Sequence, residues 1–292
     1  MTKPLVGCVI VNWNGWRDTV ACLDALRAID YPELVVVVVD NGSRDDSVQR
    51  IRTVHPEIRL VQTGRNLGFS GGNNVGIREV MHHNVKYVWL LNNDTRPAPH
   101  ALRELVQTAE SDTRLGAVGS VLHYMSDPQK IQVWGGGWIN LWTGYNSHAT
   151  AHPRSGRLDF LTAASMLVSR NALEDVGLMD DRFFLYWEDA ELCFRLRRSG
   201  WQLGVASQAI VFHNVNASTS KGSTSIDRCY TYSGIRFLSQ YSHVPQAATF
   251  LFLCRRLLHR ALSGRVKAMG SVLQGVRDYR DRDRWAPLPE LG

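Results

Sequence analysis

A carboxylate and two amides follow directly after an apolar run of the chain. The run spans residues 87–91, and Asn92, Asn93 and Asp94 come next. An unalternating run of Val, Trp and Leu indicates a strand buried on both faces, as in parallel sheets covered by helices. Ligands of such sheets bind beyond the carboxyl ends of the strands, where this triplet would lie. Its oxygens suit a hard divalent cation that also binds phosphate, although Asn and Asp are also common in simple turns.

Polar residues also mark the ends of two other predicted strands. The first strand ends near Asn12 and leads into Asn14, and the second is followed by Asp40 and Asn41. Because the carboxyl ends of neighbouring parallel strands meet at one edge of a sheet, we expect these side chains and the triplet to share one crevice.

A glycine-rich segment, residues 64–74, is predicted to be a loop that follows the third strand and opens a helix. Glycine lets the backbone approach an anion closely, and the amides at a helix start favour phosphate. The glycine spacing is neither GxGxxG nor that of a P-loop, which argues against a dinucleotide fingerprint and a Walker motif. A nucleoside diphosphate held together with a metal fits these features best.

The elements that must position these residues alternate between strands and helices. Strands are predicted at 5–13, 34–39, 58–63 and 86–91. A helix is predicted after each of them: at 19–28, from a capping box at Ser43 and Asp46 to about 55, from the glycine-rich segment to 82, and after Pro99 to about 111. Four alternations at short spacing predict an α/β fold with a doubly wound sheet.

The second half of the chain is less regular. Strands are predicted at 115–122, 158–169 and 202–213, helices at 171–176 and 190–199, and a long loop or small excursion at 134–156. An aromatic patch at 183–187 leads into Glu188 and Asp189. The aromatic residues of the excursion either stack on sugar rings or simply pack.

The composition excludes several classes of protein. With 292 residues, 44% hydrophobic and 21% charged, the chain is typical of globular proteins. Its five cysteines are scattered and odd in number, which argues against a disulfide scaffold or a cysteine zinc site and fits a reducing cytosol. No signal peptide is visible, and the longest apolar block, residues 247–254, is shorter than the ~20 residues of a membrane-spanning helix. A cytoplasmic protein is therefore expected.

The net charge of +6 lies in the C-terminal region, because residues 255–285 hold nine Lys or Arg and three Asp, and 9 − 3 = +6. Such a tail favours an anionic lipid surface as partner, with nucleic acid second. If the run from Phe250 is helical, an apolar stripe faces a basic one, and Phe252 falls on the basic side. The apolar stripe holds Phe250, Leu253, Cys254, Leu257, Leu258 and Ala261, and the basic stripe holds Arg255, Arg256, His259 and Arg260. This helix either lies in a membrane interface or packs on the main domain with a solvated basic face.

Six motifs in order resemble the inverting glycosyltransferases of family 2, especially the branch with bacterial rhamnosyltransferases. They are VNWNG, VVDNGS, GRNLGFSGGNN, LLNNDT, FFLYWEDAELCFR, and His213 with Ser218 beyond it. The resemblance implies a GT-A fold, that is, a Rossmann-like nucleotide-sugar-binding sheet flanked by helices. It implies a GT-A domain at 1–235, with a nucleotide-binding half at 1–115 and an acceptor half at 116–235, before a helical basic extension at 236–292.

The resemblance also implies a nucleotide-sugar donor and places residues around it. Asp40 would contact the base, and the loop from Asn66 to Asn74 would lie near the ribose and diphosphate. Arg195 either contacts the diphosphate or forms a salt bridge. The donor-binding candidates are Asn12, Asn14, Asp40, Asn41, Arg65, Asn66, Gly68, Asn73, Asn74, Asn93 and Arg195.

A divalent cation, Mg²⁺ or Mn²⁺, is implied as well. Asp94 matches the last aspartate of the family's DXD motif, and Asn92 stands where the first is often found, so the site has one negative charge less. His213 matches a histidine that completes the metal site in some members, the alternative being an ordinary strand-end histidine. Asp189 matches the catalytic base that takes the proton of the acceptor hydroxyl, and Glu188 is an acceptor-binding candidate.

The expected activity is transfer of L-rhamnose from dTDP-L-rhamnose to a saccharide acceptor carried by a lipid, at the cytoplasmic face of the inner membrane. The choice of L-rhamnose as the donor sugar rests on the resemblance, and the choice of a lipid-linked acceptor rests on the basic tail. A UDP-hexose donor with another acceptor, and a non-catalytic nucleotide-sugar-binding module, are the alternatives. Nucleic acid is not the expected partner, because few aromatic residues interleave with the basic ones.

Overall fold

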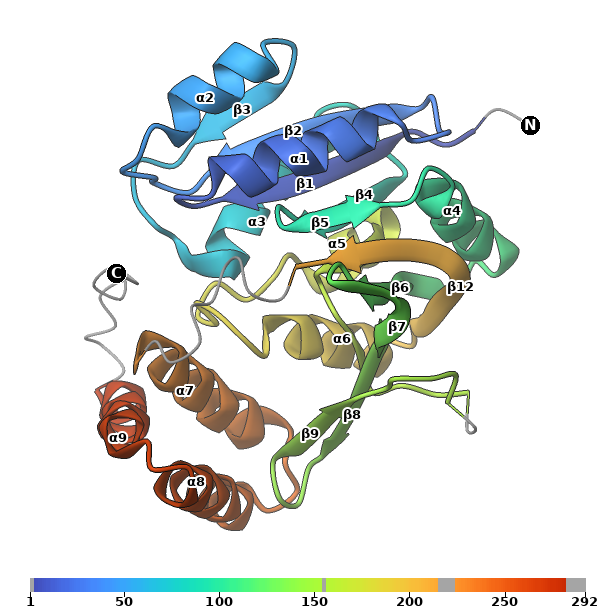
Figure 1. Cartoon of the computed structure of the whole chain (residues 1–292). Helices are drawn as coiled ribbons and strands as arrows, with labels where there is room; N and C mark the ends of the chain where they lie inside the picture. Colours follow the sequence, from blue (N-terminus) through green and yellow to red (C-terminus); the bar gives the residue numbers. More distant parts are fainter. Residues whose placement is uncertain (1–2, 154–155, 215–223, 282–292) are drawn as a thin grey trace.

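The computed structural model describes residues 3–153, 156–214 and 224–281. Within these ranges the chain forms a large mixed sheet, a small second sheet and helices on both faces of the large one (Figure 1). Ser218 and the basic residues Arg282 and Arg284 lie outside the described ranges.

The strands of the large sheet are β1 (Val6–Asn12), β2 (Leu34–Asp40), β3 (Arg59–Gln62), β4 (Tyr87–Asn92), β5 (Thr95–Pro97), β6 (Leu115–Tyr124), β7 (Asp127–Trp134), β11 (Ser165–Ser169) and β12 (Gln202–His213). The small sheet holds β8 (Gly136–Asn140), β9 (Tyr145–His148) and β10 (Phe160–Leu161). The helices are α1 (Trp16–Arg27), α2 (Ser47–Val54), α3 (Gly68–Met81), α4 (Ala101–Ser111), α5 (Arg170–Val176), α6 (Glu188–Arg198), α7 (Thr224–Tyr241), α8 (Pro245–Leu262) and α9 (Val266–Arg280).

The first four strands form the parallel half that the apolar runs predict. Their order is β3-β2-β1-β4, and Asn12 is paired in register with Asp40. Buried side chains of α1, α2 and α4 pack on one face, and those of α3, α5 and α6 pack on the other. The α/β prediction is confirmed for this half.

The second half of the sheet is mixed and curls back on the first. β11 runs antiparallel to both β4 and β6, and β12 runs parallel to β6. β5 follows β4 after Asn93 and Asp94, yet it pairs with β12 at the far end of the strand order, with Thr95 opposite His213. The curl therefore brings the end of β12 beside the residues that follow β4.

Three predictions about local structure are wrong in detail. Most of the glycine-rich segment belongs to helix α3. Gly72 and Gly76 let this helix pack closely on β1 and β2, where larger side chains would clash. The predicted capping box does not start α2, which begins at Ser47 without a side-chain cap. The strand predicted at 158–169 is broken into β10 and β11.

The excursion at 134–156 holds β8 and β9, which form a hairpin that pairs with β10. The exposed aromatic residues Trp138, Trp142 and Tyr145 lie on this hairpin. Figure 1 shows the hairpin at the same end of the molecule as α7, α8 and α9.

The C-terminal helices begin earlier than predicted. α7 runs from Thr224 to Tyr241, so the predicted domain boundary at residue 235 falls inside a helix. α7 and α8 pack on the core through Phe237 and Phe252, whose rings contact Trp187. No helix among the described residues is long and apolar enough to cross a membrane.

Candidate active site

Asp94 and His213 meet at the edge where the sheet curls. The Nε2 atom of His213 lies 3.3 Å from Oδ1 of Asp94, and the amide of Asn214 donates to the Asp94 carbonyl. Both side chains are largely buried, with Asp94 only 4% exposed. Sequence reasoning placed these two residues in one site although 119 positions separate them, and the structure brings them together.

The histidine is oriented by Gln132 of β7. Nδ1 of His213 lies 3.0 Å from Oε1 of Gln132, and because an amide oxygen only accepts, Nδ1 carries the proton. In a neutral ring with this tautomer, the lone pair of Nε2 faces the carboxylate of Asp94. A nitrogen lone pair and a carboxylate oxygen 3.3 Å apart repel each other unless a proton or a cation lies between them. In metal-binding histidines, the ring nitrogen that does not bind the metal usually donates its hydrogen to an oxygen, as Nδ1 does here to Gln132.

The oxygen of Asn92 adds a third possible ligand. Its Oδ1 is buried and has no hydrogen-bond partner within the described ranges. Among the residues that the structure describes, no three His, Cys, Asp or Glu side chains gather into a metal site. Asp94 and His213 therefore form a corner of few protein ligands, with Asn92 two residues before Asp94. Such a corner would suit Mg²⁺ or Mn²⁺, because these ions share their coordination with waters and substrate phosphates.

Glu188 and Asp189 open helix α6 directly after a strained turn. Tyr186 and Trp187 both have a φ of 69°, the left-handed region that non-glycine residues rarely adopt. The Trp187 ring is buried against Phe237 at 5.0 Å between centroids, and Ser233 of α7 donates to the carbonyl of Leu185. Packing against α7 therefore holds the turn that aims the two carboxylates.

The two carboxyl groups titrate above their ordinary range. Burial raises the pKa of Asp189 to about 6, although the amides of Ala190 and Ala163 donate to it and favour its ionised form. Burial, followed by the charge of Asp189, raises the pKa of Glu188 well above its usual value. Oε2 of Glu188 is buried and has no hydrogen-bond partner among the described residues. A carboxylate with a pKa near the working pH suits a general base.

Ala163 and Ala164 join the carboxylates to the Asp94 corner. The amide of Ala163 lies 3.4 Å from Oδ2 of Asp189, and the carbonyl of Ala164 accepts from the amide of Asn92 at 3.0 Å. This Ala163–Ala164 bridge places Asp189 and Asn92 on two sides of one dipeptide. Asp189 and Asn92 are therefore connected through the backbone of two residues.

Polar contacts around Asp40 connect the loops that follow β1 and β2. Its carboxylate accepts from Nδ2 of Asn12 at 2.9 Å and from the amide of Ser43 at 3.1 Å. Asn14 accepts from the amide of Arg44, and Asn93 donates to Thr19. These bonds fix the loops after β1, β2 and β4 relative to one another.

Several predicted donor-binding side chains support the fold instead. Asn41 bonds to Asn66 and to the backbone of Leu67 and Gly68. The amide of Gly68 donates to Asn66, and that of Phe69 donates to Phe184, so these two amides at the start of α3 already have partners. The prediction that the start of this helix cradles phosphate is therefore not supported.

Asn73 and Asn74 are also structural. Nδ2 of Asn73 donates to the carbonyl of Phe69 one turn earlier. Asn74 is 5% exposed and bonds through both ends of its amide to the backbone of Met179. It thereby holds the segment before the turn at Tyr186 and Trp187.

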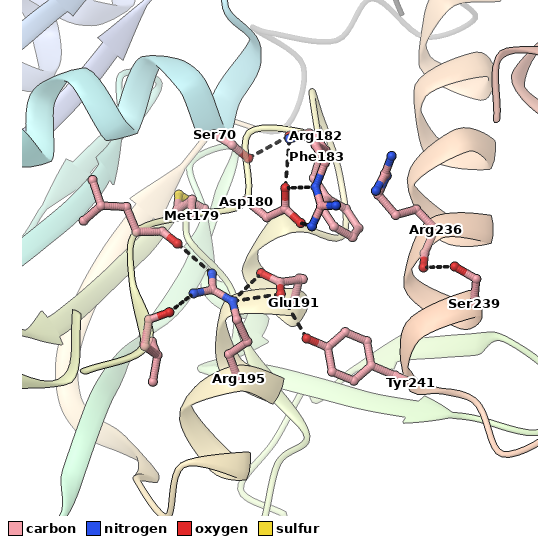
Figure 2. Close-up of polar contacts among 12 residues, drawn as sticks. Ser70, Met179, Asp180, Arg182, Phe183, Glu191, Arg195, Arg236, Ser239 and Tyr241 are labelled. Atoms are coloured by element: carbon pink, nitrogen blue, oxygen red, sulfur yellow. Dashed lines mark hydrogen bonds and ion pairs between the residues drawn. The ribbon is translucent and has the colours of Figure 1, made fainter. Parts of the chain in front are cut away.

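Arg195 does not point to a diphosphate. Its guanidinium donates to Glu191 and to the carbonyls of Val176, Gly177 and Leu178. Figure 2 shows Arg195 beside Glu191, which also accepts from the Tyr241 hydroxyl at 2.9 Å. The salt-bridge alternative is therefore confirmed. Arg195 ties α6 to the segment 176–178, and its partner Glu191 ties α6 to α7 through Tyr241.

The family model described as "Glycosyltransferase like family 2" matches residues 4–229. The chain belongs to this glycosyltransferase family. It is an enzyme of the GT-A fold, and the predicted fold class and enzyme class are confirmed.

Named relatives of this glycosyltransferase transfer different sugars. It is 29% identical over 209 residues to the N-acetylglucosaminyl-diphospho-decaprenol L-rhamnosyltransferase of Mycobacterium tuberculosis, covering 64% of this chain and 68% of that protein. It is 26% identical over 220 residues to galactofuranosyltransferase GlfT1 of Mycolicibacterium smegmatis, covering 73% of this chain and 72% of that protein.

A solved structure shows the same fold. The mannosyltransferase PcManGT from Pyrobaculum calidifontis, in complex with GDP-Man and Mn²⁺, superposes with a TM-score of 0.59 at 15% identity. The match covers 99% of this chain and 78% of that protein.

Three supporting residues of this glycosyltransferase were missed by sequence reasoning. Gln132 orients His213, Ser43 bonds to Asn12, and Trp187 fills the turn before the carboxylates. Trp187 stands in the quoted FFLYWED motif, so its position was a usable signal. Gln132 and Ser43 act through contacts between distant segments, for which periodicity offers no signal.

Replacing Gln132→Leu is expected to weaken metal binding by this glycosyltransferase about 10- to 100-fold, because His213 loses the partner that fixes its ring. The concentration of Mn²⁺ that gives half-maximal turnover measures this effect. Gln129→Leu is the control, since Gln129 lies on the same strand β7 and is exposed. An unchanged Mn²⁺ requirement in Gln132→Leu would remove His213 from the metal site.

Proposed function

We propose that this glycosyltransferase moves L-rhamnose from dTDP-L-rhamnose, with inversion, onto a lipid-linked saccharide used in cell-surface polysaccharide synthesis. The observation that carries the chemistry is the Ala163–Ala164 bridge, which ties Asp189 to the Asn92 side of the cation corner. The relative named as a decaprenol-linked L-rhamnosyltransferase supports this choice of donor and acceptor. We place the reaction at the cytoplasmic face of the inner membrane.

In the proposed reaction Asp189 is the general base. It takes the proton of the acceptor hydroxyl while that oxygen attacks the anomeric carbon, and the bond to the diphosphate breaks on the opposite face of the sugar. A pKa of about 6 leaves Asp189 ionised at neutral pH yet basic enough to accept the proton. Glu188, when protonated, can donate a hydrogen bond to another acceptor hydroxyl.

The residues that would hold a divalent cation are Asp94, His213 and Asn92. When bound, Mg²⁺ or Mn²⁺ offsets the negative charge that develops on the leaving diphosphate. We assign Asp40 to the nucleotide base, and the exposed Arg65 to the ribose and diphosphate. We assign Asn14 and Asn93, which lie in the segments after β1 and β4, to the border of this site.

Release of nucleoside diphosphate from a panel of nucleotide sugars tests the proposal. The panel includes dTDP-L-rhamnose, UDP-hexoses, UDP-galactofuranose and GDP-mannose, each with Mg²⁺, Mn²⁺ or EDTA, and with or without a polyprenyl-diphospho-N-acetylglucosamine acceptor. We expect metal-dependent turnover of dTDP-L-rhamnose that the lipid-linked acceptor accelerates. Turnover of a UDP-sugar alone would replace the donor assignment, and no turnover with any donor and acceptor pair would favour a binding module.

A further inference from the structure

Helix α8 packs on the protein with its basic side inward. Ala248 and Phe252 are buried, and Arg256 and Arg260 both donate to Asp227 of α7, at 2.5 Å and 2.6 Å. Phe252, which breaks the apolar stripe of the sequence, is the anchor of the helix. Both interpretations of this helix from the sequence place its basic stripe on the outside, and the structure overturns that for Arg256 and Arg260.

The apolar side of α8 consequently faces outward. Phe250 is 66% exposed, Leu251 45%, Leu258 60% and Leu262 81%. At about 100° per residue these four side chains fall within an arc of about 120° on the helix. Isolated exposed apolar residues are ordinary, but a contiguous apolar face of this kind marks an interaction site.

The tip of the β8–β9 hairpin extends the same surface. Trp142 is 58% exposed and its ring lies 5.8 Å from that of His243, directly before α8. Tyr145 is 44% exposed and lies 3.9 Å below the guanidinium of Arg255. Figure 1 shows the hairpin beside α8. We name the set Trp142, Tyr145, Phe250, Leu251, Leu258 and Leu262 the docking face.

The charges around the docking face have one sign. Helix α8 contains no Asp or Glu, and Arg255 at its edge is exposed. Arg265 and Lys267, which follow α8, are exposed as well. An acidic surface with an apolar interior is the complement of such a face, and a bilayer with anionic lipid has both. Trp and Tyr also favour the level of the lipid headgroups.

We propose that the docking face inserts into the interface of a bilayer that contains anionic lipid. Because Arg256 and Arg260 already pair with Asp227, apolar insertion contributes more than attraction by the basic tail. Binding should therefore persist at high salt, which screens exposed charges but not apolar contacts. The proposal rests on the proposed function only in taking the acceptor to be carried by a lipid.

Flotation of the full-length protein with vesicles tests the docking face. The vesicles contain phosphatidylcholine with or without phosphatidylglycerol, at low and at high salt. We expect binding to the phosphatidylglycerol vesicles at both salt concentrations, and a loss of at least about tenfold in the triple variant Phe250→Ser, Leu258→Ser, Leu262→Ser. Val54→Ser is the matched control, since Val54 is 43% exposed and lies on α2.

Two further measurements make each outcome decisive. Circular dichroism verifies that the triple variant is folded, and sizing in solution reports whether the native chain is a dimer that the variant breaks. A dimer lost in the variant, unchanged vesicle binding, or no binding by the native chain would each overturn the proposal. Donor hydrolysis without vesicles should be equal in the native chain and the variant, so a failed docking face leaves the proposed activity testable by itself.

Discussion

Asp189→Asn is expected to lower the rate of sugar transfer roughly 100- to 10,000-fold, the range that a positioned general base contributes. The amide has the shape of the carboxylate but cannot take the proton of the acceptor hydroxyl. Donor affinity should change little, because the base acts on the acceptor. Initial rates of transfer and the donor Kd, measured on the same preparation, separate the two effects.

The pH dependence provides an independent check on Asp189. The group must be ionised to act, so the native rate should rise with pH as the pH passes through about 6, and this limb should be absent from the residual rate of Asp189→Asn. Glu188→Gln is the matched control from the neighbouring position. If Glu188→Gln loses the activity and Asp189→Asn keeps it, the base is Glu188.

Asp94→Ala is the second substitution for which we expect a large effect. It removes the one carboxylate of the cation corner, so metal-dependent release of nucleoside diphosphate should fall by at least about 100-fold. Added Mn²⁺ should not restore it, because His213 and Asn92 remain without a charged ligand. Turnover as a function of Mn²⁺ concentration, with and without EDTA, measures this loss.

A nearby carboxylate serves as the control for Asp94. Asp18 has a raised pKa, caused first by burial and then by the charge of Asp94, so it lies within the same electrostatic field. Asp18→Asn should keep most of the metal-dependent rate. Native turnover that resists EDTA, together with an active Asp94→Ala protein, would contradict the metal assignment.

The sequence predicted the parallel half of the fold because each buried strand there is an apolar run that ends in polar residues. It also predicted that Asp94 and His213 share a site, through the resemblance to a family. The glycine-rich segment misled us, since the same glycines that permit a phosphate loop also permit α3 to pack closely on the sheet. Composition does not distinguish these two uses of glycine.

The orientation of α8 could not be obtained from the sequence either. Helical periodicity identifies two faces, but the face that packs is decided by the partner, here Asp227 and Trp187 on other segments. Likewise, the prediction for Arg195 stayed open until the carbonyls of the segment 176–178 were known to surround it. Such contacts join residues that lie far apart along the chain.

The thickness of α8 determines how far the docking face lies from the turn that precedes Glu188. Phe252 on its inner side lies 6.0 Å from the Trp187 ring, and Trp187 directly precedes Glu188 and Asp189. An α-helix with its side chains is about 10–12 Å across, so little more than one helix separates the docking face from the catalytic turn. If the acceptor is a lipid-linked saccharide, as we propose, this short separation favours acceptors with few sugars between the lipid and the reacting hydroxyl.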